Sequence, residues 1–298
     1  MHINISETPV AQYQQWLQFA IAPRPICFAS TIDASGNVNL SPFSFFNLVS
    51  YKPAIVVFSV VRKMRDGSTK HTLQNILEVP EVVINICDYD MVQQMSLSSC
   101  EFAKSTDEFI KSGFTKTPAI LVKPPMVQEA KVQLECKVLE VKSLGDNGGA
   151  GQLVIAEILN MHVHDTILNS AGNMIDPKKL ALVARLGGDW YCKVDATNLF
   201  EIDKPTTQIA IGVDALPSSI RNSHILTGNN LAQLANVVEI PFVDATFTDD
   251  KLKHIFQYYA LNAADMEQEL HSYAKELLAQ NNVQAAWQVL LLLAGENV

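Results

Sequence analysis

Residues 62–72 hold the densest cluster of side chains suited to binding an anion. Four basic residues, one histidine and three hydroxyl residues occupy these eleven positions of an otherwise acidic chain. An apolar run at 54–61 precedes the cluster and a helical pattern follows it, so the cluster opens a predicted helix. Free N–H groups at a helix start, with Lys and Arg beside them, bind phosphate well. A solvated loop is the alternative, and the missing G-x-x-x-x-G-K-[ST] pattern argues against a Walker-type nucleotide loop.

Residues 39–47 interleave polar and aromatic side chains along an extended segment. This pattern suits a flat heteroaromatic ligand with polar edges, although three phenylalanines in four positions are also typical of core packing. The segment lies one predicted strand before the basic cluster. A mononucleotide needs a ring site and a phosphate site at about this separation, so the two segments together indicate a mononucleotide site.

A third segment, residues 184–191, contains the pair Gly187-Gly188, which permits a turn or a close backbone approach. Arg185 and Tyr191 flank this pair and are candidates to face a ligand. A tight turn into a last strand is the alternative for this segment.

The other reactive residue types form no recognisable catalytic or metal pattern. His162 and His164 have a spacing that a metal could use, but no third ligand is evident, so we predict no metal site. The five cysteines contain no C-x-x-C pair and fit neither a zinc site nor a disulfide framework. Without a Ser-His-Asp or paired-carboxylate arrangement, we predict no catalytic side chain and a cofactor that supplies the reactive atom.

Residues 26–163 are predicted to be mainly β. The apolar runs at 26–32 and 38–43 predict a hairpin around a turn cluster. Alternating residues at 132–138 are expected to pair with 152–163 across a glycine-rich turn. Many short strands without β-α-β alternation favour a β-barrel over a Rossmann sheet.

The sequence pattern changes after residue 195. Residues 209–213 still alternate, but beyond residue 248 apolar residues recur with the spacing of amphipathic helices. Residues 196–298 hold five basic and twelve acidic side chains, a net charge of −7. We therefore predict a first domain at 1–195 and a mixed, then helical, acidic extension at 196–298.

The composition excludes several classes of partner. The 298 residues carry a net charge of −9 at pH 7, which nucleic-acid backbones and anionic lipids would repel, so we expect neither a nucleic acid nor a membrane as partner. The first residues lack the basic start and apolar run of a signal peptide, and the longest apolar stretches are far below the ~20 residues of a membrane span. These features predict a cytoplasmic protein.

Several motifs in the same order resemble the flavin reductase-like, flavoredoxin-type FMN-binding proteins. They cover roughly residues 10–195 and are more specific together than any one of them alone. In chain order the motifs are A-P-R-P-I at 22–26, S-T at 30–31, residues 39–47, K-H-T-L-Q-N at 70–75, residues 132–135 and A-R-L-G-G-x-x-Y at 184–191.

The resemblance implies a mainly β, split β-barrel of Greek-key type with a C-terminal α-helical extension, a homodimer, and FMN bound near the subunit interface. It implies that residues 41–47 line the flavin ring and that Arg62 and two short segments, 30–31 and 70–72, hold the phosphate. One departure is His71, where relatives usually carry Asp. A protonated His would strengthen phosphate binding, whereas the loss of Asp would leave the helix start less well capped. The expected cofactor-binding residues are Ser30, Thr31, Ser41, Pro42, Phe43, Ser44, Asn47, Arg62, Lys70, His71 and Thr72.

Together these features predict an FMN-dependent oxidoreductase that accepts hydride from NADH or NADPH. Its electrons would pass to free flavin, to an electron-accepting partner protein or to another acceptor. Two alternatives stay open: a non-enzymatic FMN electron carrier, and an interaction scaffold whose acidic helical tail is the functional part.

Overall fold

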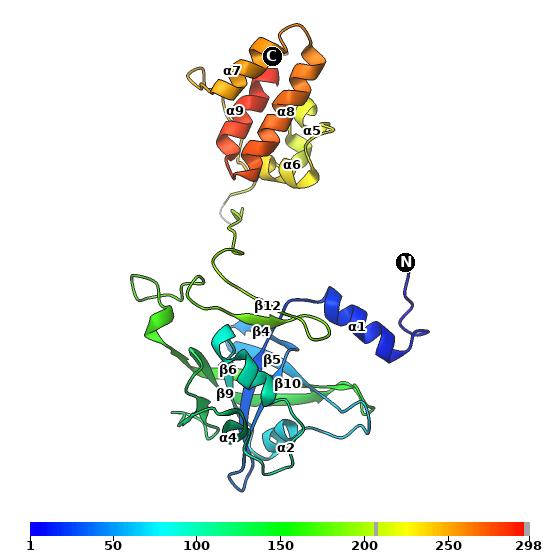
Figure 1. The fold of residues 1–298 in the computed structure, drawn as a ribbon, viewed down its shortest axis with the longest axis vertical. Helices are drawn as coiled ribbons and strands as arrows, with labels where there is room; N and C mark the ends of the chain where they lie inside the picture. The colour runs from blue at the N-terminus through cyan, green and yellow to red at the C-terminus, as the bar shows by residue number, and fades with distance from the viewer. Residues whose placement is uncertain (206–207, 295–298) are drawn as a thin grey trace. The chain divides into compact units, whose positions relative to one another are not determined.

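The computed structural model describes residues 1–205 and 208–294, and the chain divides into two compact units. Unit 1, Met1–Phe200, is a large antiparallel sheet with helices packed against it, and unit 2, Glu201–Val298, is helical in its described part (Figure 1).

The elements of unit 1 are α1 (Val10–Ala20), β1 (Arg24–Pro25), β2 (Cys27–Ile32), β3 (Val38–Phe43), β4 (Phe46–Tyr51), β5 (Ala54–Val61), α2 (His71–Glu78), β6 (Glu81–Ile86), η1 (Tyr89–Met91), α3 (Val92–Leu97), α4 (Glu108–Ser112), β7 (Lys116–Thr117), β8 (Met126–Val127), β9 (Val132–Ser143), β10 (Gly151–Val163), η2 (Asp165–Ile167), β11 (Val183–Arg185) and β12 (Tyr191–Lys193). Those of unit 2 are η3 (Val213–Ala215), α5 (Ser218–Arg221), α6 (Gly228–Ala235), α7 (Asp250–Tyr258), α8 (Ala263–Ala279) and α9 (Val283–Ala294).

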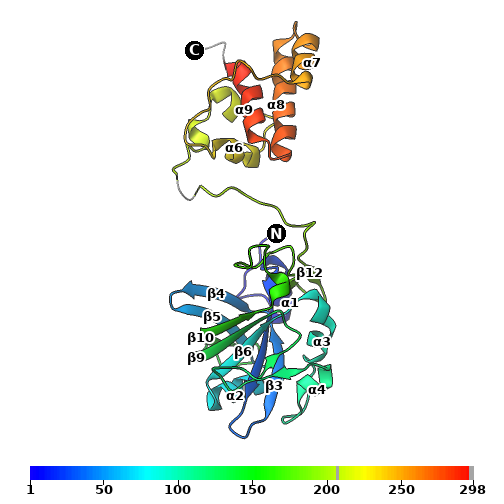
Figure 2. The same ribbon diagram turned by 90° about the vertical axis from the view of Figure 1, so that its left-hand side faces the viewer.

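Seven strands of unit 1 form one antiparallel sheet in the order β3-β2-β6-β9-β10-β5-β4 (Figure 2). This order contains both predicted pairings, β2 with β3 and β9 with β10. The end strands β3 and β4 are joined by Ser44 and Phe45, yet across the described residues they do not pair with each other. The sheet is therefore the mainly β, split barrel that the sequence predicts, and its barrel is not closed.

Strand β2 is buried on both faces because it separates two apolar cores. Cys27 and Ala29 face the core enclosed by the seven strands, whereas Phe28 faces a second core beneath α3 and α4. This alternation is the period of two expected of a strand. Helix α2 contributes Leu73 and Ile76 to the first core, and this apolar packing holds the helix against the sheet.

Unit 2 has an apolar core of its own. Trp287 of α9 is fully buried there, and its Nε1 donates a hydrogen bond to the Leu234 carbonyl at 3.2 Å. The strongly apolar last helix is thus covered within unit 2. The alternation at 209–213 does not lead to a strand, because the segment has no neighbouring strand and Ile211 N–H instead donates to the Val237 carbonyl at 2.8 Å.

None of the helices in the described part of the chain combines the length and apolarity needed to cross a bilayer.

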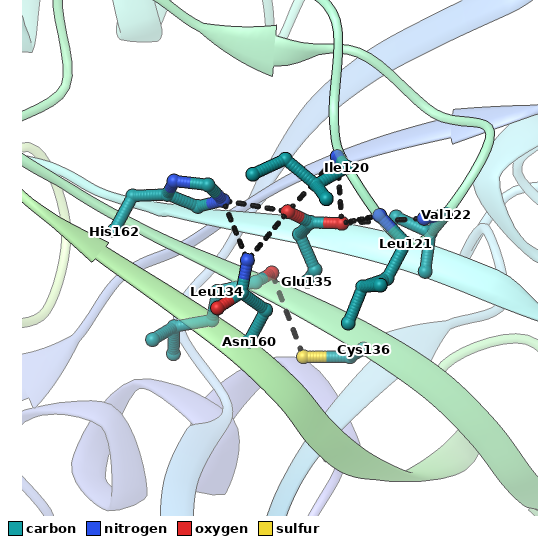
Figure 3. Close-up of polar contacts among 8 residues, drawn as sticks. All are labelled: Ile120, Leu121, Val122, Leu134, Glu135, Cys136, Asn160 and His162. Atoms are coloured by element: carbon teal, nitrogen blue, oxygen red, sulfur yellow. Dashed lines mark hydrogen bonds and ion pairs between the residues drawn. The ribbon is translucent and has the colours of Figure 1, made fainter.

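Glu135 on β9 is a fully buried carboxylate that ties the loop 120–122 to the sheet (Figure 3). Its oxygens accept hydrogen bonds from the three backbone N–H groups of this loop at 2.5–3.2 Å. Asn160 Nδ2 lies 3.1 Å and His162 Nε2 2.6 Å from Oε1. Because an ionised carboxylate only accepts, the hydrogen in the short contact belongs to the histidine ring.

These hydrogen bonds control the ionisation of Glu135. Burial opposes its charge, but the bonds from His162, from the loop N–H groups and from Asn160 outweigh burial and lower the pKa from 4.5 to about 2. A group whose pKa is depressed by folding stabilises the fold above its unfolded pKa. The contribution of Glu135 is therefore complete above pH 4.5 and is lost as the pH falls towards 2.

Glu135→Gln should lower the free energy of unfolding of unit 1 by about 3 kcal/mol at pH 7, because a neutral amide satisfies these donors poorly and turns its NH₂ towards some of them. The difference from wild type should shrink as the pH falls from 4.5 to about 2. Urea unfolding measures the free energy of unfolding of both proteins. Hydrogen exchange of the β9 and β10 amides shows which unfolding transition belongs to unit 1. Glu140→Gln is the control, since Glu140 is exposed on the same strand. Equal losses in the two variants would contradict the role given to Glu135.

Candidate functional site

A cavity of about 300 Å³, here called the seam cavity, lies at the open side of the barrel. Ser44 and Phe45 form the wall where the chain leaves β3 for β4, and the Phe45 carbonyl accepts a hydrogen bond from Ser59 N–H of β5 at 2.9 Å. The remaining lining residues are Gln18, Arg24, Ile26, Pro42, Phe43, Ser59, Val61, Lys70, Met95, Ser96, Ser99, Arg185 and Tyr191.

Two arginines from neighbouring strands give the seam cavity positive charge. Arg24 and Arg185 are directly opposite each other in the β1–β11 pair. The Arg24 guanidinium is held by the carbonyls of Gln18, Ile21 and Leu186 at 2.5–2.7 Å, while its buried Nε has no acceptor among the described residues. Burial, and then the charge of Arg185, lower the pKa of Arg24. Both effects favour an anionic or electron-rich ligand in this cavity.

Lys70 is the third cation of the seam cavity. Its ammonium lies 5.3 Å from the centre of the Phe43 ring, a cation–π distance, and no carboxylate of the described structure lies within 4.0 Å of it. Burial lowers the pKa of Lys70, an effect that Glu101 opposes and Lys63 reinforces. A lysine held without an ion-pair partner is positioned to bind an anion.

A second cavity of about 100 Å³, the helix-start cavity, surrounds the first residues of α2 and shares Lys70 and Ser99 with the seam cavity. The helix begins at His71, and its cap, Lys70, makes no side-chain capping bond. The backbone N–H groups of His71 and Thr72 therefore find no acceptor in the described structure. Unpaired N–H groups at a helix start are suitable donors for a phosphate.

His71 is partly buried beside two further lysines. Burial, followed by the charges of Lys63 and Lys104, lowers the pKa of its imidazole below 6.5. These effects favour the neutral ring, which offers hydrogen bonds to an anion but no positive charge.

Thr72 is held by a buried polar network. Its hydroxyl donates to Asn39 Oδ1 at 2.6 Å, and Asn39 Nδ2 donates to Glu108 Oε1 at 2.9 Å. The second oxygen of Glu108 accepts from Leu40 N–H at 3.0 Å. Burial raises the pKa of Glu108, against the effect of these hydrogen bonds. Because the hydroxyl proton is used within the network, Thr72 offers its backbone N–H to a ligand.

Seven of the eleven predicted cofactor-binding residues line one or both of these connected cavities. They come from β3, the β3–β4 link and the start of α2: Ser41, Pro42, Phe43, Ser44, Lys70, His71 and Thr72. Arg185 and Tyr191, the third candidate segment, line the seam cavity, where Arg185 Nη1 donates to the Tyr191 hydroxyl at 2.5 Å.

The other four predicted residues lie outside the two cavities, and their roles stay predictions. Ser30 and Thr31 are buried on β2, where the Thr31 hydroxyl accepts from Asn75 of α2 at 3.2 Å. Asn47 is exposed on β4, and its Oδ1 accepts from the N–H of the next residue at 2.9 Å. Arg62 points to another turn, donating to the Gly67 carbonyl at 3.0 Å.

The sequence alone does not identify the side of the site formed by α3 and the two residues that follow it. Ser96 and Ser99 line the seam cavity, while Ser98 and Ser99 line the helix-start cavity. A usable signal was the run S-L-S-S-C at 96–100, in which hydroxyl residues gather at the end of an apolar helix. Asn39 lay within a predicted segment without being singled out, and nothing in the local pattern pointed to Glu108.

The arrangement suits a flat ring joined to an anionic group. The seam cavity offers apolar and aromatic walls with cations at its edge, and the helix-start cavity offers N–H donors and Lys70. In the described part of the chain, no group of three or more His, Cys, Asp or Glu residues is arranged to hold a metal ion.

Comparison with known proteins covers the same region. A family model described as the flavin reductase like domain matches residues 19–178, so the match includes the β-barrel up to β10 and excludes unit 2. An uncharacterized protein of Halalkalibacterium halodurans is 35% identical over 189 residues, which cover 63% of this chain and 88% of that protein.

Two solved structures resemble the chain in both fold and sequence. Nitrilotriacetate monooxygenase component B from Bacillus cereus is 27% identical with a TM-score of 0.63, and the similarity covers 68% of this chain and 98% of that one. The 2-nitrobenzoate 2-nitroreductase of Pseudomonas fluorescens is 25% identical with a TM-score of 0.62, over 71% of this chain and 100% of that one.

Proposed function

We propose that this chain, which belongs to the flavin reductase-like domain family, is an FMN-dependent oxidoreductase that accepts hydride from NADH or NADPH and passes the electrons to another acceptor. Membership of the family supports a flavin and redox chemistry. The choice of FMN rests on the geometry of the site, and the nicotinamide donor and the enzymatic role are the parts of the proposal that the mixing experiment below tests.

The observation that carries the proposal is the junction of the two cavities at Lys70 and Ser99. FMN consists of a flat ring, a flexible ribityl chain and a terminal phosphate, and this order matches a ring-sized cavity that leads into an anion-binding helix start. The helix-start cavity of about 100 Å³ is of a size that suits a terminal phosphate. We therefore propose FMN as the flavin.

Each part of the site has a separate task in this proposal. Lys70 and the N–H groups of His71 and Thr72 would hold the phosphate, and Pro42 and Phe43 would lie beside the ring. When bound, FMN supplies the ring atom that accepts hydride, which no side chain could do.

The protein's contribution to the reaction is electrostatic and positional. The positive charges of Arg24 and Arg185 at the seam cavity favour a ring that has gained electrons, because fixed charges act strongly where water is limited. The described residues of the cavity offer no paired carboxylates and no Ser-His-Asp group, so the proposal gives no side chain an acid–base role.

Anaerobic mixing with NADH and NADPH is expected to bleach the flavin absorbance of the purified protein within seconds. A reductase brings nicotinamide and flavin into contact, whereas an electron carrier does not. Stopped-flow absorbance between ~350 and ~500 nm records the change of the bound cofactor. A flavin-loaded protein that neither nucleotide reduces, but that dithionite does, would instead be an electron carrier.

Lys70→Ala should weaken FMN binding by roughly 1.5–3 kcal/mol, the range for a hydrogen bond to a charged group. Riboflavin, which lacks the phosphate, should bind wild type and variant almost equally. Fluorescence titration of the apoprotein measures both affinities. Lys137→Ala is the matched control, because Lys137 is exposed on β9. A parallel loss of riboflavin affinity in Lys70→Ala would show that Lys70 supports the fold instead of binding phosphate.

We further propose that the protein is a homodimer that buries α1 and the edge strand β4. No residue of α1 is buried, and Trp16, Phe19 and Ile21 at its end are 52%, 53% and 64% exposed. On β4, Val49 and Tyr51 are also exposed. An unpaired edge strand with apolar side chains favours association with a second copy.

Val49→Asp should convert the dimer into a monomer, because it places a charge in the apolar contact. Sedimentation equilibrium gives the mass of the species in solution. Ile110→Asp on α4, also at an exposed apolar residue, should stay dimeric. A wild-type protein that sediments as a monomer would refute the proposed dimer, and dissociation of both variants would refute the proposed interface.

A further inference from the structure

A third cavity, here called the side cavity, adjoins the seam cavity and has no part in holding the flavin as proposed. Its volume is about 450 Å³, and it lies between the η1–α3 segment and the β11–β12 pair. It shares Ser96, Arg185 and Tyr191 with the seam cavity. A ligand with one end over the seam cavity can therefore extend across Tyr191 into the side cavity.

Lys193 is the cation at the outer part of the side cavity. It follows Tyr191 by two residues on β12, so the two side chains share one face of the strand, about 7 Å apart. Val183 and Arg185, their partners on β11, share this face. The Lys193 ammonium lies 4.5 Å from the centre of the Tyr89 ring. It makes no hydrogen bond and no ion pair with the residues that the structure describes, so its N–H groups are available to a ligand.

The backbone at Tyr89 is anchored, while the residue itself is 53% exposed. Tyr89 N–H donates to the Ala181 carbonyl at 2.9 Å. Asp88, the cap of η1, is buried and forms an ion pair with Lys131 at 2.8 Å. The cation–π contact with the Tyr89 ring keeps the Lys193 ammonium on the side of the cavity that Tyr89 lines.

Cations outnumber acids in this cavity. Arg185 lies over the Tyr191 ring at 4.6 Å, and its Nη2 donates to the Gly188 carbonyl at 2.5 Å. Asp189 is the one carboxylate among the lining residues, and it is exposed. Two cations, each over a tyrosine ring, form a surface for an elongated ligand that carries phosphate groups and an aromatic base.

We propose that the side cavity binds the adenosine-phosphate half of the nicotinamide substrate, and that Lys193 binds its additional 2′-phosphate and so selects NADPH over NADH. The proposal rests on the reductase function proposed above, because it assumes that the nicotinamide ring occupies the seam cavity beside the flavin. Lys193 is a specificity-determining residue in this view and takes no part in hydride transfer.

The test compares Lys193→Ala with wild type on the flavin-loaded protein. The KM for NADPH should rise about tenfold in the variant, with kcat and the KM for NADH unchanged, because one charge-assisted contact to a phosphate is lost. Lys142→Ala, at an exposed lysine on β9, is the control and should change neither KM. Thermal melting confirms that both variants are folded.

A binding measurement without turnover keeps this inference separate from the proposed function. Calorimetric titration of the oxidised, flavin-loaded protein with 2′,5′-ADP should give about tenfold weaker binding in Lys193→Ala, whereas 5′-AMP should bind both proteins equally. Equal changes for both nucleotides, or no change, would overturn the role of Lys193. If 2′,5′-ADP binds as expected but neither nicotinamide nucleotide reduces the flavin, the site stands and the reductase function falls.

Discussion

The path of the chain between the two edges of the sheet is the constraint on which the site depends. Strands β3 and β4 are separated by Ser44 and Phe45 alone, a link that elsewhere would close a hairpin. Here the chain continues from one edge of the sheet to the other, where the Phe45 carbonyl accepts from Ser59 N–H and β4 pairs with β5. The barrel therefore stays open at this link, and the seam cavity lies beside it.

The open side of the barrel holds positively charged side chains that form no ion pairs with the described residues, although the chain as a whole is acidic. The protein has a net charge of −9, yet Arg24, Lys70 and Arg185 have no carboxylate within ion-pair distance among the described residues. Such isolated cations cost free energy when desolvated, which the lowered pKa values of Arg24 and Lys70 record. An anionic cofactor would remove this cost, so these charges indicate a site built for binding.

The sequence predicted what depends on local pattern and missed what depends on distant contacts. The β2–β3 hairpin and the β9–β10 pair follow from alternation and turn residues, and helix α2 follows from the helical pattern after the basic cluster. The direction of Arg62 does not, because it depends on the Gly67 carbonyl and on Asp146, 84 positions away. Likewise, the pairing of β4 with β5 shifts by one residue between Leu48 and Ser50, and no pattern in the sequence reveals this shift.

The helical unit 2 buries apolar residues of its own, and none of its described residues lines the three cavities. Its last helix is so apolar that it needs a cover, and the unit itself provides one, with Trp287 at the centre. Every lining residue of the three cavities precedes residue 194, so unit 1 contains the complete set of groups proposed for binding. A unit with a net charge of −7 would repel the phosphates of a nicotinamide nucleotide, whereas the cations of β11 and β12 attract them. Both the position of the cavities and the distribution of charge therefore support placing the proposed nucleotide site in unit 1.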